Sequence, residues 1–158
     1  MNHFRILLTT AAIACTLSIR AETADTTPVE AISPQEVVEA ALYGKTNTMA
    51  AALKQGYKPD TRDPENRTAL MYAAFHGQTK IIEQLIAAGT DVNLQDATGT
   101  TALMFGASGP STETVQLLLD SGAKINMVDS NEHFTALMWA AAEGQTKNVE
   151  LLLENGAD

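Results

Sequence analysis

The sequence predicts an all-α solenoid of stacked helix–turn–helix units, and two observations lead to this fold class. The four-residue word Thr-Ala-Leu-Met occurs at residues 68–71, 101–104 and 135–138, with spacings of 33 and 34 residues. Each word is followed by a second apolar run and then by a glycine, which is Gly89, Gly122 or Gly156. Self-similarity at such a period is typical of supersecondary units that bury their apolar faces only against their neighbours.

Residues 1–21 have the pattern of a signal peptide. Arg5 is followed by residues 6–19, which are apolar or small and carry no charge, and Ala21 offers a small residue for cleavage before Glu22. A membrane-spanning helix needs about 20 residues, so this stretch is short for one. Two alternatives stay open. The segment is an uncleaved anchor, or Cys15 carries a lipid, because residues 12–15 resemble a bacterial lipoprotein box.

Residues 22–32 have little to bury and are interpreted as a flexible linker. The repeat domain is predicted to span residues 33–158. It begins with Ser33, Pro34 and Glu36, which together have the pattern of a capping box with a first-turn proline. The helix pair expected in residues 33–62 lacks the repeated word and carries more polar residues, so we interpret it as an N-terminal capping repeat.

Residues 63–95, 96–128 and 129–158 share one physical plan. In the first of these units Thr68 is expected to cap a helix with a thin apolar face, and Gly77 turns the chain. Residues 81–86 then give a second helix a broader apolar face, which ends at Gly89. Residues 96–99 follow as a tight reversal, in which Gly99 is free to adopt a positive φ.

These units resemble ankyrin repeats. The family word G-x-T-P-L-H-x-A-A-x-x-G appears at residues 66–77 as Asn-Arg-Thr-Ala-Leu-Met-Tyr-Ala-Ala-Phe-His-Gly, and the family ending G-A-D-x-N appears at 89–93 as Gly-Thr-Asp-Val-Asn. The resemblance covers residues from about 34 to 158. It implies an ankyrin-repeat solenoid with β-hairpin-like loops between helix pairs. The T-A-L-M spelling is similar to that of many bacterial ankyrin proteins, so a small exported bacterial type is expected.

Three departures from the family pattern carry structural expectations. Alanine replaces the family proline and methionine replaces the family histidine, so Met71, Met104 and Met138 are expected to pack where a Thr–His hydrogen bond is usual. Asn66 stands where a turn glycine is expected, and asparagine tolerates that conformation. Pro110 replaces a glycine between the helices of unit 96–128, whose first helix is therefore expected to be weaker.

The last unit, residues 129–158, is interpreted as an incomplete repeat, because the sequence stops at Asp158 inside the family phrase. No polar cap follows in the sequence, so Val149, Leu152 and Leu153 are expected to leave part of their stacking face exposed. We expect either that the sequence is a fragment or that this face meets another molecule.

Charge and composition argue against nucleic-acid binding and catalysis. The net charge is −9, and cleavage after Ala21 would leave 8 Lys+Arg against 19 Asp+Glu, or −11, a surface that repels phosphate. Cys15 is the only cysteine, so a disulfide framework and a cysteine-based zinc site are excluded. His76 and His133 have no companion ligands, and no nucleophile elbow or phosphate loop is present. We therefore expect no enzyme activity, no metal and no cofactor.

Binding of another protein remains, and the resemblance implies where it occurs. Ankyrin proteins engage partners with their hairpin tips and with the concave face of their first helices. Tip positions outside the main candidate set are Glu65, Thr98, Asn131 and Glu132. The candidate partner-binding residues are Arg67, Tyr72, Phe75, His76, Thr100, Phe105, His133, Phe134, Trp139 and Glu143.

The aromatic residues among these candidates allow two readings. Tyr72, Phe105 and Trp139 occupy one repeat position and either form a binding stripe or wedge between repeats as core. Phe134, on a loop tip, is expected to be a direct contact. Phe134→Ala should then weaken partner binding and leave thermal stability nearly unchanged.

The expected function is that of an exported, periplasmic module that binds, blocks or protects an envelope protein. The partner is expected to present a basic patch, because an acidic surface steers association electrostatically. The alternative is a membrane-tethered scaffold that assembles envelope components, held by lipidated Cys15 or by an uncleaved N-terminal segment. A membrane is expected as a partner only through that segment.

Overall fold

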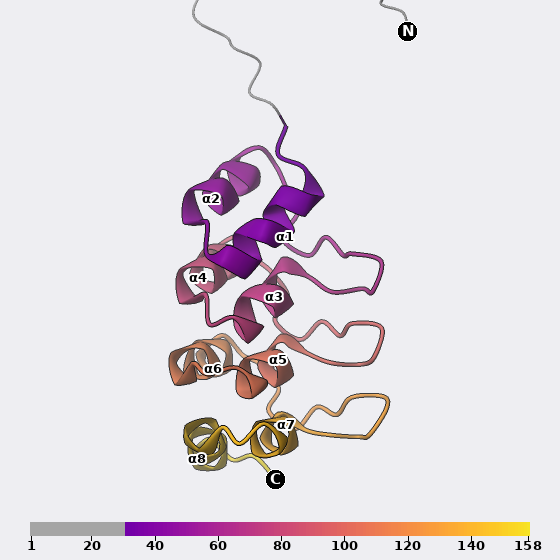
Figure 1. Cartoon of the computed structure of the whole chain (residues 1–158), viewed down its shortest axis with the longest axis vertical. Coiled ribbons are helices and arrows are strands. Elements are labelled where there is room, and N and C mark those ends of the chain that lie inside the picture. Colours follow the sequence, from indigo (N-terminus) through magenta and orange to yellow (C-terminus); the bar gives the residue numbers. More distant parts are fainter. Residues whose placement is uncertain (1–30) are drawn as a thin grey trace, which may run out of the picture. The chain divides into compact units, whose positions relative to one another are not determined.

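Eight short helices stack in pairs through residues 31–158, the part of the chain that the computed structural model describes (Figure 1). The signal-peptide prediction, Cys15 and the predicted linker up to residue 30 lie outside the described residues. The helices are α1 (Pro34–Tyr43), α2 (Thr46–Lys54), α3 (Ala69–Phe75), α4 (Thr79–Ala87), α5 (Ala102–Ser108), α6 (Thr112–Asp120), α7 (Ala136–Ala142) and α8 (Thr146–Glu154).

The helices form two rows. Helices α1, α3, α5 and α7 make one row, α2, α4, α6 and α8 make the other, and hairpin-shaped loops project beside the first row (Figure 1). Residues 31–158 hold no β-strand, but two loops close with isolated antiparallel bridges, Arg62 to Thr68 and Gln95 to Thr101. The predicted all-α solenoid with hairpin-like loops is therefore confirmed.

One apolar core runs through the four helix pairs. The first helices contribute mostly small buried side chains, such as Ala73, Ala74 and Ala107, which let α3, α5 and α7 pack closely. The second helices contribute larger buried side chains, such as Ile81 and Leu118. Burial of such aliphatic groups is the main favourable term in folding, so each helix pair depends on its neighbours for stability.

Helix α1 begins with the predicted capping box. The Ser33 N–H donates to the Glu36 carboxylate at 2.8 Å, and the Glu36 N–H donates to Ser33 Oγ at 3.3 Å, which completes a capping box. Ile32, at the end of the predicted linker, already packs against the core and donates its N–H to Gln55 Oε1 at 3.1 Å.

A residue with positive φ forms the tip of each loop. Asn66 has φ 61° and Gly99 has φ 79°, which confirms both predictions. His133 has φ 59° at the equivalent point of the longer third loop, where the sequence gave no glycine or asparagine signal. Gly99 is also required by space, because a Cβ there would lie 2.7 Å from the Ser130 backbone nitrogen.

The methionine prediction is confirmed in two repeats and wrong in the third. Met71 and Met104 are buried, and each Sδ also accepts the N–H of the threonine three residues earlier at 3.4 Å. The methionine therefore takes a polar role as well as a packing role. Met138 is 46% exposed, because within the described residues no further helix pair covers its side of α7.

The turn that contains Pro110 differs from its counterparts, whereas the helix before it keeps its length. The expected weakening of that helix stays a prediction. Helix α5 has seven residues, as α3 and α7 do. Gly109 has φ −78°, whereas Gly77 in the equivalent turn has φ 69°. The buried Asn148 side chain stabilises this turn, since it donates to the carbonyls of Ala107 at 3.0 Å and Gly109 at 2.8 Å.

The outer face of the last helix pair is only partly exposed. Leu153 is 54% exposed, as expected, and Val149 is half-buried. The expectation is wrong for Leu152, which is fully buried and belongs to the apolar core where α8 packs against α6 and α7. Among residues 31–158 no helix is long and apolar enough to cross a membrane.

Candidate partner-binding surface

The three projecting loops, residues 63–67, 96–100 and 129–134, are hydrogen-bonded to one another. The Ala97 N–H donates to the Glu65 carbonyl at 2.9 Å, and the Ser130 N–H donates to the Thr98 carbonyl at 2.8 Å. The Arg62 guanidinium adds a bond to the Gln95 carbonyl at 2.8 Å. Backbone bonds between successive loops fix their spacing, so the loops present a continuous edge rather than three independent tips.

An aspartate opens each loop and organises it. Asp63, Asp96 and Asp129 stand at the same repeat position, and one carboxylate oxygen of each accepts two backbone N–H groups of its own loop, at distances from 2.8 to 3.4 Å. Such Asx-type bonds satisfy the turn's free donors. Asp63 therefore acts as a turn former in the first loop.

Two of these aspartates also hold an aromatic side chain of the following helix. Tyr72 donates its hydroxyl to Asp63 Oδ2 at 2.5 Å, and the indole N–H of Trp139 donates to Asp129 Oδ2 at 3.1 Å. Phe105, at the same position in the middle repeat, has no polar group to donate. The stripe of Tyr72, Phe105 and Trp139 is half-buried and packs against the core, which supports the core reading in part. The reading of the stripe as a binding surface stays a prediction.

These contacts shift the pKa values of the partners. Burial raises the pKa of Asp63, but the bonds from Tyr72 and from the backbone, with the nearby Arg67, outweigh it and hold that pKa below its usual range. Burial likewise opposes ionisation of Asp129, and its backbone and indole donors again bring the pKa below the usual range. Burial, and then the bond to Asp63, raise the pKa of Tyr72 to about 12.

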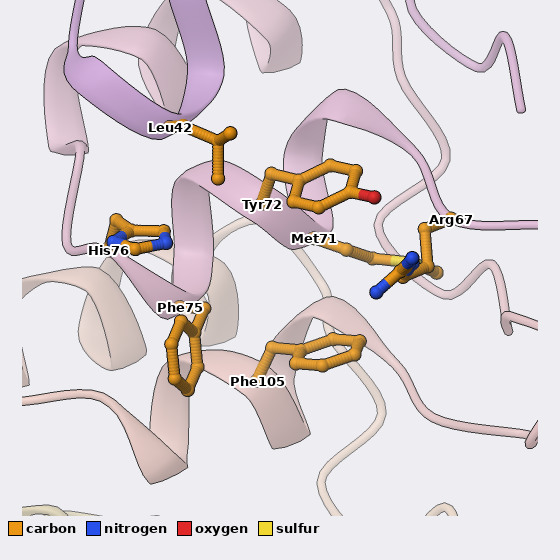
Figure 2. A pocket seen from close by; sticks show the side chains of 7 residues that line it. All are labelled: Leu42, Arg67, Met71, Tyr72, Phe75, His76 and Phe105. Atoms are coloured by element: carbon orange, nitrogen blue, oxygen red, sulfur yellow. The ribbon is translucent and has the colours of Figure 1, made fainter. Parts of the chain in front are cut away.

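A first hollow, with a volume of about 250 Å³, lies among α1, α3 and α5. Figure 2 shows Leu42 and Tyr72 on one side of it and Phe75 and Phe105 on the other, with Arg67 and His76 at opposite ends. Its seven lining residues are Leu42, Arg67, Met71, Tyr72, Phe75, His76 and Phe105.

The charge in the first hollow is already neutralised within the protein. The Arg67 guanidinium lies 5.1 Å from the centre of the Tyr72 ring and pairs with Asp63 at 3.3 Å and with Glu65 at 3.2 Å. A guanidinium stacked on a ring and paired with two carboxylates leaves a mostly apolar lining for a partner.

A second hollow, of about 420 Å³, lies among α3, α5, α7 and the loops. It shares Phe75 and Phe105 with the first hollow, and these two rings meet edge-on with centroids 6.4 Å apart and an interplanar angle of 88°. It contains three carboxylates and no lysine or arginine. The lining residues are Phe75, Thr98, Thr100, Phe105, Ser108, Asp129, Asn131, Glu132, Trp139 and Glu143.

The structure brings most of the predicted binding residues into these two hollows. Arg67, Tyr72 and His76 line the first, Thr100, Trp139 and Glu143 line the second, and Phe75 and Phe105 line both. Thr100 is only 5% exposed, and its hydroxyl lies 2.9 Å from that of Thr98.

Two predicted residues line neither hollow. His133 is exposed on the third loop, whereas Phe134 is half-buried and meets the Trp139 ring edge-on at 6.3 Å. Phe134 therefore supports Trp139 in addition to any contact with a partner. Four lining residues were missed from the sequence, namely Leu42, Met71, Ser108 and Asp129. For Asp129 the available signal was its shared repeat position with Asp63 and Asp96.

Stacked helix pairs joined by hairpin-shaped loops define a repeat solenoid. A family model for ankyrin repeats (3 copies) matches residues 37–129 and 71–158. These matches span most of the chain, and the chain therefore belongs to the ankyrin-repeat family. A comparison with curated proteins found no match.

Ankyrin repeats indicate a protein–protein interaction module, and proteins of this family are typically binding modules rather than enzymes. Within residues 31–158 there is also no group of three or more His, Cys, Asp or Glu side chains that could hold a metal ion.

Proposed function

We propose that this chain is an exported module that binds a partner protein across the two hollows and blocks or protects that partner sterically. The observation that supports this proposal is the position of Phe75. Its side chain is 44% exposed, lies between the hollows and lines both. Aromatic side chains at the centre of a surface, ringed by polar groups, are the usual energetic anchors of protein interfaces.

The charge of the chain indicates the chemistry of the partner. The net charge of −9, together with Glu132 and Glu143 at the second hollow, favours a partner with a basic patch. Charge complementarity of this kind raises association rates and is screened by salt. Association with the partner should therefore slow as ionic strength rises.

The proposed location rests on residues 1–21, which have the pattern of a signal peptide. A tethered scaffold is the second candidate, because Cys15 stands in residues that resemble a lipoprotein box. Labelling of cells with a fatty-acid analogue separates the two. A label that is lost in Cys15→Ser supports the tether, whereas an unlabelled chain that begins near Glu22 in the periplasm supports release by signal cleavage.

The binding proposal is tested by capture followed by a measured affinity. Tagged protein from Glu22 onward is incubated with envelope extract beside a Phe75→Ala variant, and captured proteins are identified by mass spectrometry. Tyr43→Ala is the matched control, because Tyr43 is also an exposed aromatic, at 70%, but lines neither hollow. The captured protein is then purified and titrated against all three forms.

We expect Phe75→Ala to weaken binding by about 2 kcal/mol or more, as truncation of an interface anchor does, and Tyr43→Ala to leave it unchanged. A partner that binds all three forms equally would refute the assigned surface. Capture of no specific protein by folded material would refute the binding proposal.

A further inference from the structure

The second hollow has a rigid aromatic wall. Trp139 is held from two directions, because its indole N–H bonds Asp129 at 3.1 Å and its ring meets the Phe134 ring edge-on at 6.3 Å. Asp129 is in turn fixed by two backbone N–H groups of its loop. The Trp139 ring therefore keeps one orientation in the hollow before any partner arrives, which lowers the entropic cost of binding.

Phe75 and Phe105 complete the wall, so that rings from α3, α5 and α7 surround one space. The faces of aromatic rings carry negative potential and attract cations, most strongly for tryptophan. Apolar walls also lower the local dielectric, which strengthens the interaction of any charge held between them.

Two carboxylates at this hollow have no ion-pair or hydrogen-bond partner within residues 31–158. Glu132 and Glu143 are exposed, and neither makes an ion pair or a side-chain hydrogen bond within residues 31–158. Glu143 is also the C-cap residue of α7, where the free carbonyls of the helix end add negative potential. The Asp129 carboxylate is occupied by N–H donors and serves to position Trp139.

The first hollow provides the contrast. There the protein supplies its own guanidinium, Arg67, which already lies over a ring and pairs with two carboxylates. The second hollow has rings and carboxylates in a similar combination, but its lining includes no lysine or arginine.

We propose that the second hollow binds a positively charged side chain, an arginine or a lysine, that the partner protein inserts between Trp139 and Phe105 and pairs with Glu132 and Glu143. This proposal rests on the proposed binding function. It specifies that one side chain of the partner's basic patch enters the second hollow. A guanidinium suits the space best, because its planar group stacks on a ring while its N–H groups meet carboxylates.

The test uses a defined probe and a reporter that belongs to this hollow alone. The probe is a short peptide, capped at both ends, with one central arginine between glycine and serine residues. Trp139 is the only tryptophan in the chain, so the indole N–H signal in a nitrogen–proton NMR spectrum reports on the hollow. We expect a saturable shift of that signal with a Kd on the order of 1 mM, as for one exposed cation–π contact with ion pairing.

Matched variants separate a specific site from general acidity. Glu132→Gln with Glu143→Gln removes two charges at the hollow, and Glu83→Gln with Glu154→Gln removes two exposed charges on α4 and α8. We expect the first pair to weaken peptide binding by about tenfold and the second to change it less than twofold. A peptide with citrulline in place of arginine should leave the indole signal unmoved.

The proposal is overturned if the arginine peptide leaves the indole signal unmoved, if citrulline serves equally well, or if both variant pairs weaken binding to the same extent. These results are distinguishable from failure of the proposed function. A captured partner that depends on Phe75 but is indifferent to Glu132→Gln with Glu143→Gln would keep the binding surface and remove only the cation site.

Discussion

The two hollows share a wall and differ in charge. Phe75 and Phe105 border both, and each hollow adds one further ring of the same stripe, Tyr72 on one side and Trp139 on the other. The first hollow contains a neutralised Arg67, whereas the second contains carboxylates without a cation from its own lining.

The difference shows how a repeat protein varies its surface without changing its fold. The rings come from the first helices, whose sequences share the Thr-Ala-Leu-Met motif. The charges come mainly from the loops, whose sequences differ more from one repeat to the next. Arg67, Thr100 and Phe134 occupy the same loop position directly before the helix-capping threonine. Arg67 lines the first hollow and Thr100 lines the second, so the residue at this position sets part of the chemistry of each hollow.

The largest effect is expected from removing the carboxylate that organises the second hollow. Asp129 is 3% exposed and accepts from two backbone N–H groups and the Trp139 indole. Asp129→Ala should lower the free energy of unfolding by about 3 to 4 kcal/mol, because buried donors lose their acceptor. Denaturant titration measures this loss, and the Trp139 fluorescence should shift as its ring is released.

Asp63→Ala is the comparison for that measurement. The Asp63 side chain is 14% exposed, so water can replace part of what the carboxylate supplied, and a smaller loss is expected. Equal losses for the two variants would contradict the view that water can replace the Asp63 carboxylate more easily than the Asp129 carboxylate.

Gly99→Ala should have the next largest effect, because it disturbs the contact between the second and third loops. Its φ of 79° disfavours a side chain, and a Cβ would lie 2.7 Å from the Ser130 nitrogen. We expect a loss of about 2 to 3 kcal/mol in the free energy of unfolding. Gly122→Ala is the control, since it has φ 87° but open space around it, and should cost about 1 kcal/mol. Similar costs would mean that the loops are not in close contact.

Tyr72 should make stability depend on pH in the alkaline range. Its pKa in the folded protein is about 12, above the ordinary value of 10. The folded state therefore holds this proton more tightly than the unfolded state, and the contribution is complete below pH 10 and is lost as the pH rises toward 12. After allowance for partial exposure we expect a loss of about 1 to 2 kcal/mol.

The Tyr72→Phe variant isolates this contribution from those of the other tyrosines. It should be less stable than the parent at neutral pH, and the difference should shrink between pH 10 and 12 when unfolding free energies are measured across that range. A difference that stays constant with pH would mean that the hydroxyl of Tyr72 does not depend on Asp63.

The smallest effect is expected for Phe134→Ala. The ring meets Trp139 edge-on at 6.3 Å, and such a pair contributes about 0.5 to 1.5 kcal/mol. We therefore expect Phe134→Ala to cause a small loss in the free energy of unfolding instead of none. Thermal or chemical unfolding measures this loss. A loss above about 3 kcal/mol would place Phe134 in the core, and no loss at all would mean that it does not support Trp139.

Sequence periodicity was sufficient for the fold, because each repeat carries the same local signals. The threonine word, the apolar runs and the capping box at Ser33 act over a few residues, and the structure confirms the helices that they predict. The positive φ of Asn66 was also predictable, since asparagine is one of the few residues that tolerate the left-handed conformation. The positive φ of His133 was not, because the extra residue in that loop shifts the register of the turn.

The candidate surface was predictable as a set of positions but not as a set of contacts. Repeat alignment placed Tyr72, Phe105 and Trp139 in one stripe. It did not show that Asp63 and Asp129 hold two of these rings, because such bonds depend on side-chain rotamers across nine or ten residues. The division into two hollows of different charge likewise depends on packing between repeats.

The most direct test of the binding surface is a footprint on the protein once a partner is in hand. Backbone amide signals or hydrogen-exchange rates are measured for the domain alone and in complex with the captured partner. The changes are predicted to concentrate on α3, α5, α7 and the three loops, with the largest near Phe75 and Trp139. Changes confined to α2, α4, α6 and α8 would contradict the assigned surface and place the partner on the opposite row of helices.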